Sequence, residues 1–203
     1  VIIPTFKPQE YLWECLDSLK EQTFSMDKFE VIIVLNGEKD PYFSQIEEYT
    51  SRHTALKIKV LHTDVSGVSN ARNIGLDNAE GRFIVFIDDD DKISRSYLED
   101  LYNRADDETI VISNTYDFKD PESLIDVRAT QLHATLSQKG RSSLKDSRRF
   151  FFTVWMKMIP SAVIGGCNSI SEVCVGSLRK LHIFIENERI GRTYTEGTIL
   201  LVI

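Results

Sequence analysis

The stretch Phe83-Ile84-Val85-Phe86-Ile87-Asp88-Asp89-Asp90-Asp91 decides the fold. Five apolar residues have the length of a buried strand, and the four carboxylates after them repel one another where the sheet removes part of their water. A bound cation would relieve this repulsion, and oxygen-only ligands favour Mg²⁺ or Mn²⁺ over zinc or iron. If the chain stays extended, Asp88 and Asp90 point to one side and Asp89 and Asp91 to the other, so at most two or three share one metal. The alternative is a solvated acidic turn, which the preceding buried strand disfavours.

Outward from this stretch, short apolar runs alternate with amphipathic segments. The strand candidates are Val1–Ile3, Glu30–Leu35, Ile58–Leu61, Phe83–Ile87 and Thr109–Ile112. We expect helices after Pro8 (with Tyr11, Leu12, Cys15, Leu16 and Leu19 on one face), after Pro41 (with Phe43, Ile46 and Tyr49), at Val68–Ala79 and at Ser94–Ala105. Strands that alternate with helices predict an α/β fold, with a mostly parallel sheet covered by helices on both faces.

Ligands of such sheets bind beyond the carboxyl ends of the strands. Four of these ends carry polar, acidic or Gly-containing segments, namely Pro4–Lys7, Asn36–Asp40, Asp64–Gly67 and Asp88–Asp91. The pattern predicts a site for a polar, phosphate-bearing ligand at this edge.

Composition restricts the possible partners. The 203 residues carry a formal net charge of −7, which argues against nucleic acid as the main partner because phosphate contacts need a basic surface. Cys15, Cys167 and Cys174 show no metal-like spacing and suit a reducing compartment, so we expect a cytoplasmic protein. The first residues already have the character of a buried strand and no Met precedes them, so we expect a chain cut at its N-terminus.

The chain resembles the family 2 glycosyltransferases with the A-type, Rossmann-like fold over about residues 1–118. The residues that carry the resemblance are Val1–Lys7, Glu30–Asp40, Gly67–Gly75, Ala79, Gly81 and Phe86–Asp91, in the family's order and spacing. The resemblance implies a nucleotide-sugar-binding domain at 1–118. It also implies a smaller, less regular acceptor-side subregion at 119–203, which we expect to be truncated or divergent.

The resemblance also implies roles for residues of the donor site. Thr5 and Phe6 would contact the base and ribose. Asn36 stands where the family usually has an aspartate that accepts a hydrogen bond from the base, and its carbonyl would accept from a uracil-type imide, which makes UDP the expected donor nucleotide. Arg72 would either reach the donor phosphates or form a structural salt bridge with the aspartates.

For the aspartate run, the resemblance places Asp88 and Asp89 on the donor side, with Asp88 at the ribose or metal. Asp90, with Asp91 as its neighbour, would ligate Mg²⁺ or Mn²⁺. The implied reaction is the inverting attack of an acceptor hydroxyl on the anomeric carbon of a nucleoside-diphosphate sugar. The implied acceptor is a saccharide or lipid-linked saccharide of the cell envelope.

The general base is the weak point of the resemblance. After Trp155–Pro160, which resembles a family motif, the expected acidic pair is missing. Glu172 is the nearest carboxylate and therefore the candidate base, although a surface role is the preferred interpretation of it. Because of this gap, a non-catalytic nucleotide-sugar-binding protein remains an alternative.

Two further hypotheses depend on smaller features. Asp88-x-Asp90 after an apolar strand also resembles the haloacid-dehalogenase phosphatases, but Lys92 stands where that motif wants Thr or Val. Residues 131–138 and 142–152 are candidate helices. A basic cluster there could meet anionic lipid at the inner face of a membrane, or form an ordinary solvated helix face; its members are Lys139, Arg141, Lys145, Arg148 and Arg149.

Overall fold

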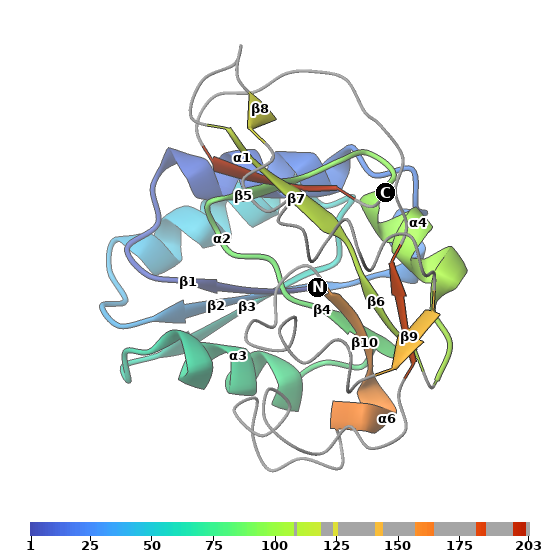
Figure 1. Cartoon of the computed structure of the whole chain (residues 1–203). Helices are drawn as coiled ribbons and strands as arrows, with labels where there is room; N and C mark the ends of the chain where they lie inside the picture. The colour runs from blue at the N-terminus through green and yellow to red at the C-terminus, as the bar shows by residue number, and fades with distance from the viewer. Residues whose placement is uncertain are drawn as a thin grey trace.

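Three parallel strands form the sheet on which the site is built (Figure 1). The computed structural model describes residues 1–107, 109–118, 124–125, 141–143, 157–164, 182–185 and 197–201. The strands lie in the order β1-β2-β3, with bounds Ile2–Thr5 (β1), Val31–Asn36 (β2) and Ile58–Thr63 (β3). Strand β4, Phe83–Val85, follows beyond β1, because Phe86 directly after it pairs in parallel with Ile2. The carboxyl ends of these strands therefore meet at one edge.

Beyond β4 the pairing is mixed. Strand β10 lies antiparallel between β4 and β6, and β11 pairs in parallel with β6 and antiparallel with β9; the bounds are Lys157–Pro160 (β10), Thr109–Ile112 (β6), His182–Ile185 (β11) and Arg141–Ser143 (β9). A further sheet has the order β5-β12-β7-β8, with bounds Asp91–Ile93, Gly197–Leu201, Asn114–Phe118 and Leu124–Ile125. Described strands after residue 118 thus pair with strands before it, and the proposed boundary at 118 stays a prediction.

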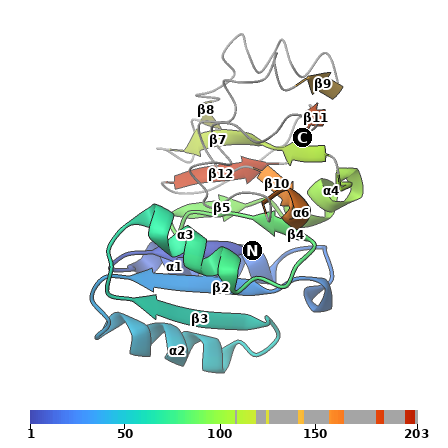
Figure 2. The same cartoon turned by 90° about the horizontal axis from the view of Figure 1, so that it is seen from below.

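Helices cover both faces of the parallel sheet (Figures 1 and 2). Helices α1 (Glu10–Lys20) and α2 (Tyr42–Arg52) lie on one face, and α3 (Val68–Asp77) lies on the other. The remaining described helices are α4 (Tyr97–Arg104), the short α6 (Ser161–Ile164) and the 3-10 turn Met26–Lys28. This arrangement confirms the predicted α/β fold.

Alternation along β1 explains the two layers. Ile3 packs with the buried residues of α1 in the main core, whereas Ile2 faces α3. The buried positions of α1 recur at helical spacing and are Leu12, Cys15, Leu16 and Leu19. On the other face, Gly75 of α3 lies so close to β1 that a Cβ there would meet Cγ2 of Ile2 at 2.4 Å. A glycine at this position lets helix and strand approach closely.

The four helices expected before residue 106 are present, with shifted ends. Pro8 lies before the first helix instead of within its first turn, because Gln9 is the N-cap residue of α1. The helix expected at 142–152 is wrong at its start, since Arg141–Ser143 is strand β9. The rest of that segment, the expected helix at 131–138 and most of the basic cluster lie outside the described residues. Among the described helices, none is both long and apolar enough to cross a bilayer.

Candidate active site

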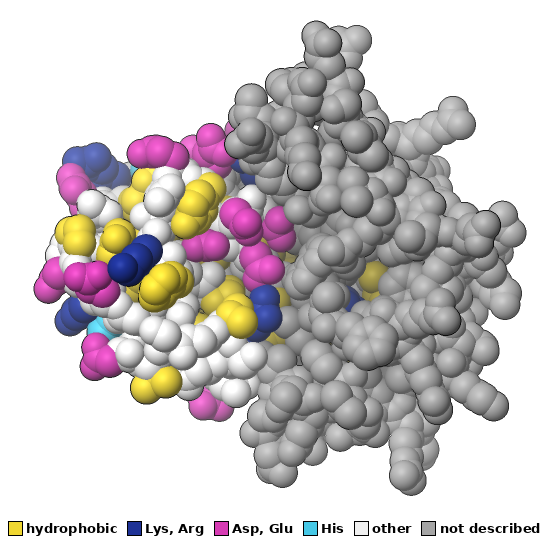
Figure 3. Space-filling model, turned by 60° about the vertical axis from the view of Figure 1, so that its left-hand side comes forward, with side chains coloured by type: hydrophobic (Ala, Val, Ile, Leu, Met, Phe, Trp, Pro, Cys, Tyr) yellow, Lys and Arg dark blue, Asp and Glu magenta, His cyan; other side chains and the backbone are white. Residues whose placement is uncertain are grey.

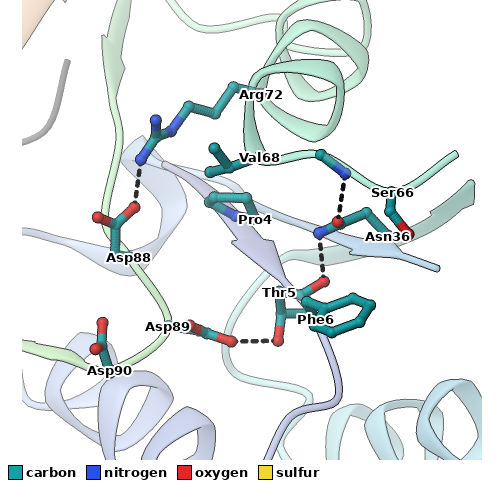
Figure 4. A pocket seen from close by; sticks show the side chains of 11 residues that line it. Pro4, Thr5, Phe6, Asn36, Ser66, Val68, Arg72, Asp88, Asp89 and Asp90 are labelled. Carbon is teal, nitrogen blue, oxygen red and sulfur yellow. Dashed lines mark hydrogen bonds and ion pairs between the residues drawn. The ribbon is translucent and has the colours of Figure 1, made fainter. Parts of the chain in front are cut away.

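A cavity of about 540 Å³ opens at the carboxyl edge of the parallel strands (Figure 4). Its walls come from the ends of β1 and β2, the β3–α3 loop, α3 and the segment after β4. The lining residues are Pro4, Thr5, Phe6, Asn36, Ser66, Gly67, Val68, Arg72, Asp88, Asp89 and Asp90. The cavity lies where the sequence predicts a polar ligand.

Most of the predicted site residues line this cavity. Among the residues that the sequence singled out, Asp91 does not line it and Glu172 lies outside the described residues. Ser66, Gly67 and Val68 line the cavity without a predicted role. Ser66 and Gly67 could have been found from the sequence, because they lie in the strand-end segment Asp64–Gly67. Val68 is a large apolar residue that is 47% exposed in the structure.

The aspartate run forms a turn. The Asp91 amide donates to the Asp88 carbonyl at 3.0 Å, which reverses the chain between β4 and β5. The chain is therefore not extended here, and the alternation of carboxylates that an extended chain would give does not apply. Asp88, Asp89 and Asp90 all border the cavity, whereas Asp91 begins β5 and is buried, with 6% exposed.

Helix α1 supports this turn from the core side. The Cys15 thiol donates to the Asp88 carbonyl at 3.8 Å, and the Ile93 amide donates to Ser18 Oγ at 3.2 Å. Lys92 Nζ lies 2.7 Å from Glu14 Oε2. These contacts fix both ends of the turn to a helix that is itself packed in the core.

Asp88 is paired with Arg72. Nη2 of Arg72 lies 2.5 Å from Oδ1 of Asp88, and their side chains are 13% and 31% exposed (Figure 4). The predicted salt bridge is thus present. Nε of Arg72 is buried and has no hydrogen-bond partner among the described residues, so the guanidinium retains donor capacity beside the cavity.

Asp89 is held by β1. The Thr5 hydroxyl donates to Oδ2 of Asp89 at 2.5 Å. Burial raises the pKa of Asp89 to about 6; the Thr5 hydrogen bond opposes the shift, while the neighbouring charges of Asp90 and Asp88 add to it. Burial and the two neighbouring carboxylates thus disfavour the ionised form of Asp89.

Asp90 is the exposed carboxylate of the turn, and it makes no hydrogen bond or ion pair with any described residue. No group of three His, Cys, Asp or Glu side chains within the described ranges could by itself hold a metal ion. Carboxylate oxygen suits Mg²⁺ or Mn²⁺, ions that usually keep waters and take substrate phosphates as further ligands. Asp90 therefore fits one protein ligand of a cation that is shared with a phosphate-bearing molecule.

Gly37 lies against Phe6, one of the residues that line the cavity. A Cβ on Gly37 would lie 2.7 Å from Cε2 of the exposed Phe6 ring. The Gly37 φ angle of 105° also favours glycine. His62 Nε2 lies 2.8 Å from the Gly37 carbonyl and supports this turn from below.

The cavity is lined by apolar side chains as well as acidic ones. Of its lining residues, Phe6 and Val68 are 49% and 47% exposed, and Val65, next to Ser66, is 63% exposed. Figure 3 shows acidic side chains gathered beside exposed hydrophobic ones on one face of the described part. An apolar rim suits a planar ring, and an acidic wall suits a cation.

Comparison with known proteins identifies relatives. The chain is 34% identical over 135 residues to the putative glycosyltransferase EpsH of Bacillus subtilis, which covers 66% of this chain and 38% of EpsH. It is 37% identical over 100 residues to the poly(ribitol-phosphate) beta-N-acetylglucosaminyltransferase TarS of Staphylococcus aureus, which covers 49% of this chain and 17% of TarS. The chain thus spans well under half the length of these curated relatives.

Solved structures share the fold. S. aureus TarS 1–349 in complex with UDP-GlcNAc has a TM-score of 0.70 at 19% identity, covering 98% of this chain and 57% of that chain. The mannosyltransferase PcManGT from Pyrobaculum calidifontis in complex with GDP-Man and Mn²⁺ has a TM-score of 0.63 at 22% identity, covering 83% of this chain and 46% of that chain. The likeness confirms the predicted A-type fold.

The family follows from the sequence match. Residues 1–164 match the family model described as glycosyl transferase family 2. This segment includes every residue that lines the cavity and the whole aspartate turn. Because the match covers most of the chain, this protein belongs to glycosyl transferase family 2.

Proposed function

We propose that the protein is a metal-dependent, inverting glycosyltransferase that moves a sugar from a nucleoside-diphosphate donor, expected to be UDP-linked, to a hydroxyl acceptor. The observation that carries this proposal is the cavity in which the uncommitted carboxylate of Asp90 stands beside the Arg72–Asp88 pair. Membership of the family supports the reaction class, and the UDP-GlcNAc complex of TarS supports the donor class.

We assign each group of lining residues to one part of the bound donor. Thr5 and Phe6 would hold the base and ribose, and Asp88 the ribose. Arg72 lines the cavity and would donate from its guanidinium to the diphosphate, since a guanidinium suits phosphate geometry. Asp90 would be the metal ligand; Asp91 stays a predicted ligand, but it is buried next to the cavity rather than in its lining.

The chemistry requires charge neutralisation and a base. The acceptor oxygen forms a bond to the anomeric carbon as the bond to the diphosphate breaks on the opposite face, and the hydroxyl proton passes to a carboxylate. A bound divalent cation supplies neutralisation of the charge that grows on the leaving diphosphate. A general base adds about 10²–10⁴-fold to such reactions. Glu172 remains the proposed base.

The proposal extends to the acceptor and to the location in the cell. TarS is named for poly(ribitol-phosphate), which supports a cell-envelope saccharide or lipid-linked saccharide as acceptor. We propose a cytoplasmic location with contact to the inner membrane face through the basic cluster, which subcellular fractionation of the full-length protein would test. The haloacid-dehalogenase alternative is not retained, because the chain belongs to another family.

The test is a transfer assay with matched metal conditions. The protein is incubated with UDP-GlcNAc and a panel of saccharide and lipid-linked acceptors, and release of UDP is measured with Mn²⁺ and with EDTA. We expect acceptor-dependent UDP release that EDTA abolishes and that Glu172→Gln lowers by about 10²-fold or more. Binding of UDP without any release or transfer would instead favour the non-catalytic binding protein.

A further inference from the structure

Asn36 connects two walls of the cavity. It ends β2 and is buried, with 5% exposed. Its Nδ2 donates to the Thr5 carbonyl at 2.7 Å, and its Oδ1 accepts from the Gly67 amide at 3.0 Å (Figure 4). One side chain thus joins the end of β1 to the residue that starts α3.

The two segments that Asn36 joins are also those that hold the aspartates. Thr5, whose carbonyl it binds, donates its hydroxyl to Asp89. Gly67, whose amide it binds, is the N-cap residue of α3, and Arg72 of that helix pairs with Asp88. Displacement of either segment would move a group that contacts the aspartate turn.

The amide of the N-cap residue Gly67 is held by this contact. Its φ angle is 141°, and α3 has no side-chain hydrogen bond at its cap. Val65 and Ser66 in the adjacent loop and Val68 at the start of α3 are exposed, so this segment has little packing of its own. The bond from the Gly67 amide to Asn36 ties the segment to β2, while the Val65 amide donates to Thr63 Oγ1 at the end of β3.

The amide of Asn36 has the chemistry that both contacts need. The Thr5 carbonyl requires a donor and the Gly67 amide requires an acceptor, and a side-chain amide supplies one of each. An aspartate would keep the acceptor for Gly67 but would place a carboxylate oxygen against the Thr5 carbonyl. The two contacts leave one N–H and one lone pair of the amide unused, but Asn36 is only 5% exposed, so little of its side chain is open to a base.

We infer that Asn36 is a positioning residue that ties the β1 end to the start of α3, and that it does not read the base of the donor. The inference rests on the proposed donor site for its binding consequence, but the two backbone contacts exist without any ligand. On this inference, a substitution of Asn36 changes nucleotide binding by altering the shape of the cavity, and it does not change the preference for uridine.

The ligand-free test is amide hydrogen exchange at Gly67, followed by NMR in the parent, Asn36→Ala and Asn36→Asp. We expect a protected amide in the parent, loss of protection in Asn36→Ala, and retained protection in Asn36→Asp. The positioning role of Asn36 would be wrong if the Gly67 amide exchanged freely in the parent, or if it were equally protected in the parent and in Asn36→Ala. Because this measurement uses no nucleotide, its result does not depend on whether the proposed function is correct.

The binding test compares three nucleotides. UDP, CDP and GDP are titrated with Mn²⁺ into the parent, Asn36→Asp and the control Asn78→Asp, which makes the same change at the far end of α3. We expect Asn36→Asp to raise all three dissociation constants by a similar factor, about tenfold, and the control to leave them unchanged. Weaker binding of UDP alone, with CDP and GDP unaffected, would show that Asn36 reads the base.

Discussion

Gly37 is a residue whose substitution should displace Phe6, a lining residue of the cavity. An alanine there would adopt an unfavourable φ of 105° and would bring its Cβ within 2.7 Å of the Phe6 ring. We predict that Gly37→Ala lowers the free energy of unfolding by about 1–3 kcal/mol and weakens nucleotide binding, because the Phe6 ring must move. Urea denaturation and UDP titration measure the two effects.

Glu38→Ala is the matched control for Gly37→Ala. Glu38 is the exposed neighbour, and its contact with Lys7 at 3.7 Å lies between side chains that are 62% and 50% exposed. Such a pair contributes little, so the free energy of unfolding should change by less than about 0.5 kcal/mol. Equal stability and equal UDP affinity of Gly37→Ala and the parent would contradict the role given to the contact between Gly37 and Phe6.

Individual residues were predictable where strand ends decide their place. Thr5, Phe6 and Asn36 line the cavity because each lies at the carboxyl end of a parallel strand or directly after one, which the apolar runs reveal. The side-chain directions of the aspartates were not predictable from alternation. A period of two holds only in extended chain, and the bond from Asp91 to Asp88 closes a turn instead.

At the scale of elements, the contact of α3 with β1 depends on Gly75. A Cβ there would lie 2.4 Å from Cγ2 and 3.3 Å from Cγ1 of Ile2, which is itself fully buried. Alanine gains about 1 kcal/mol in helix propensity, but overpacking of a buried site costs about 1–3 kcal/mol. We predict that Gly75→Ala lowers the free energy of unfolding by about 1 kcal/mol, as measured in urea.

The control for Gly75→Ala lies on the same helix. Asp77 is exposed at the last helical position, so Asp77→Ala should change the free energy of unfolding by less than about 0.5 kcal/mol. If Gly75→Ala were more stable than the parent, α3 could move away from β1 at little cost. That result would contradict the requirement for close contact between Gly75 and Ile2.

Elements were predictable when their pattern was local. The apolar runs of β1 to β4 and the amphipathic patterns of α1 to α4 can be recognised in short windows of the sequence. Strand β5 was missed because three residues that start with a carboxylate do not resemble a strand. It pairs with β12, whose residues lie about a hundred positions later, and such pairing cannot be seen in a local pattern.

At the scale of the whole molecule, the mixed part of the sheet could not be predicted, because its strands pair across long sequence distances. Strand β10 enters antiparallel between β4 and β6 from a segment that follows both of them by tens of residues. Alternation of strands and helices predicted the parallel order around β1 but carries no information on this insertion. The general base stays a prediction, because Glu172 lies outside the described residues and the sequence lacks the family's acidic pair.

The central claim concerns how the cavity uses Asp90, the carboxylate that no described residue engages. The most direct test is calorimetric titration of UDP into the parent, Asp90→Ala and the exposed control Asp77→Ala, each with Mn²⁺ and with EDTA. We predict that EDTA weakens binding to the parent by about tenfold or more, and that Asp90→Ala loses this metal dependence while the control keeps it. If Asp90→Ala bound UDP with Mn²⁺ as tightly as the parent does, the assignment of the site would be wrong.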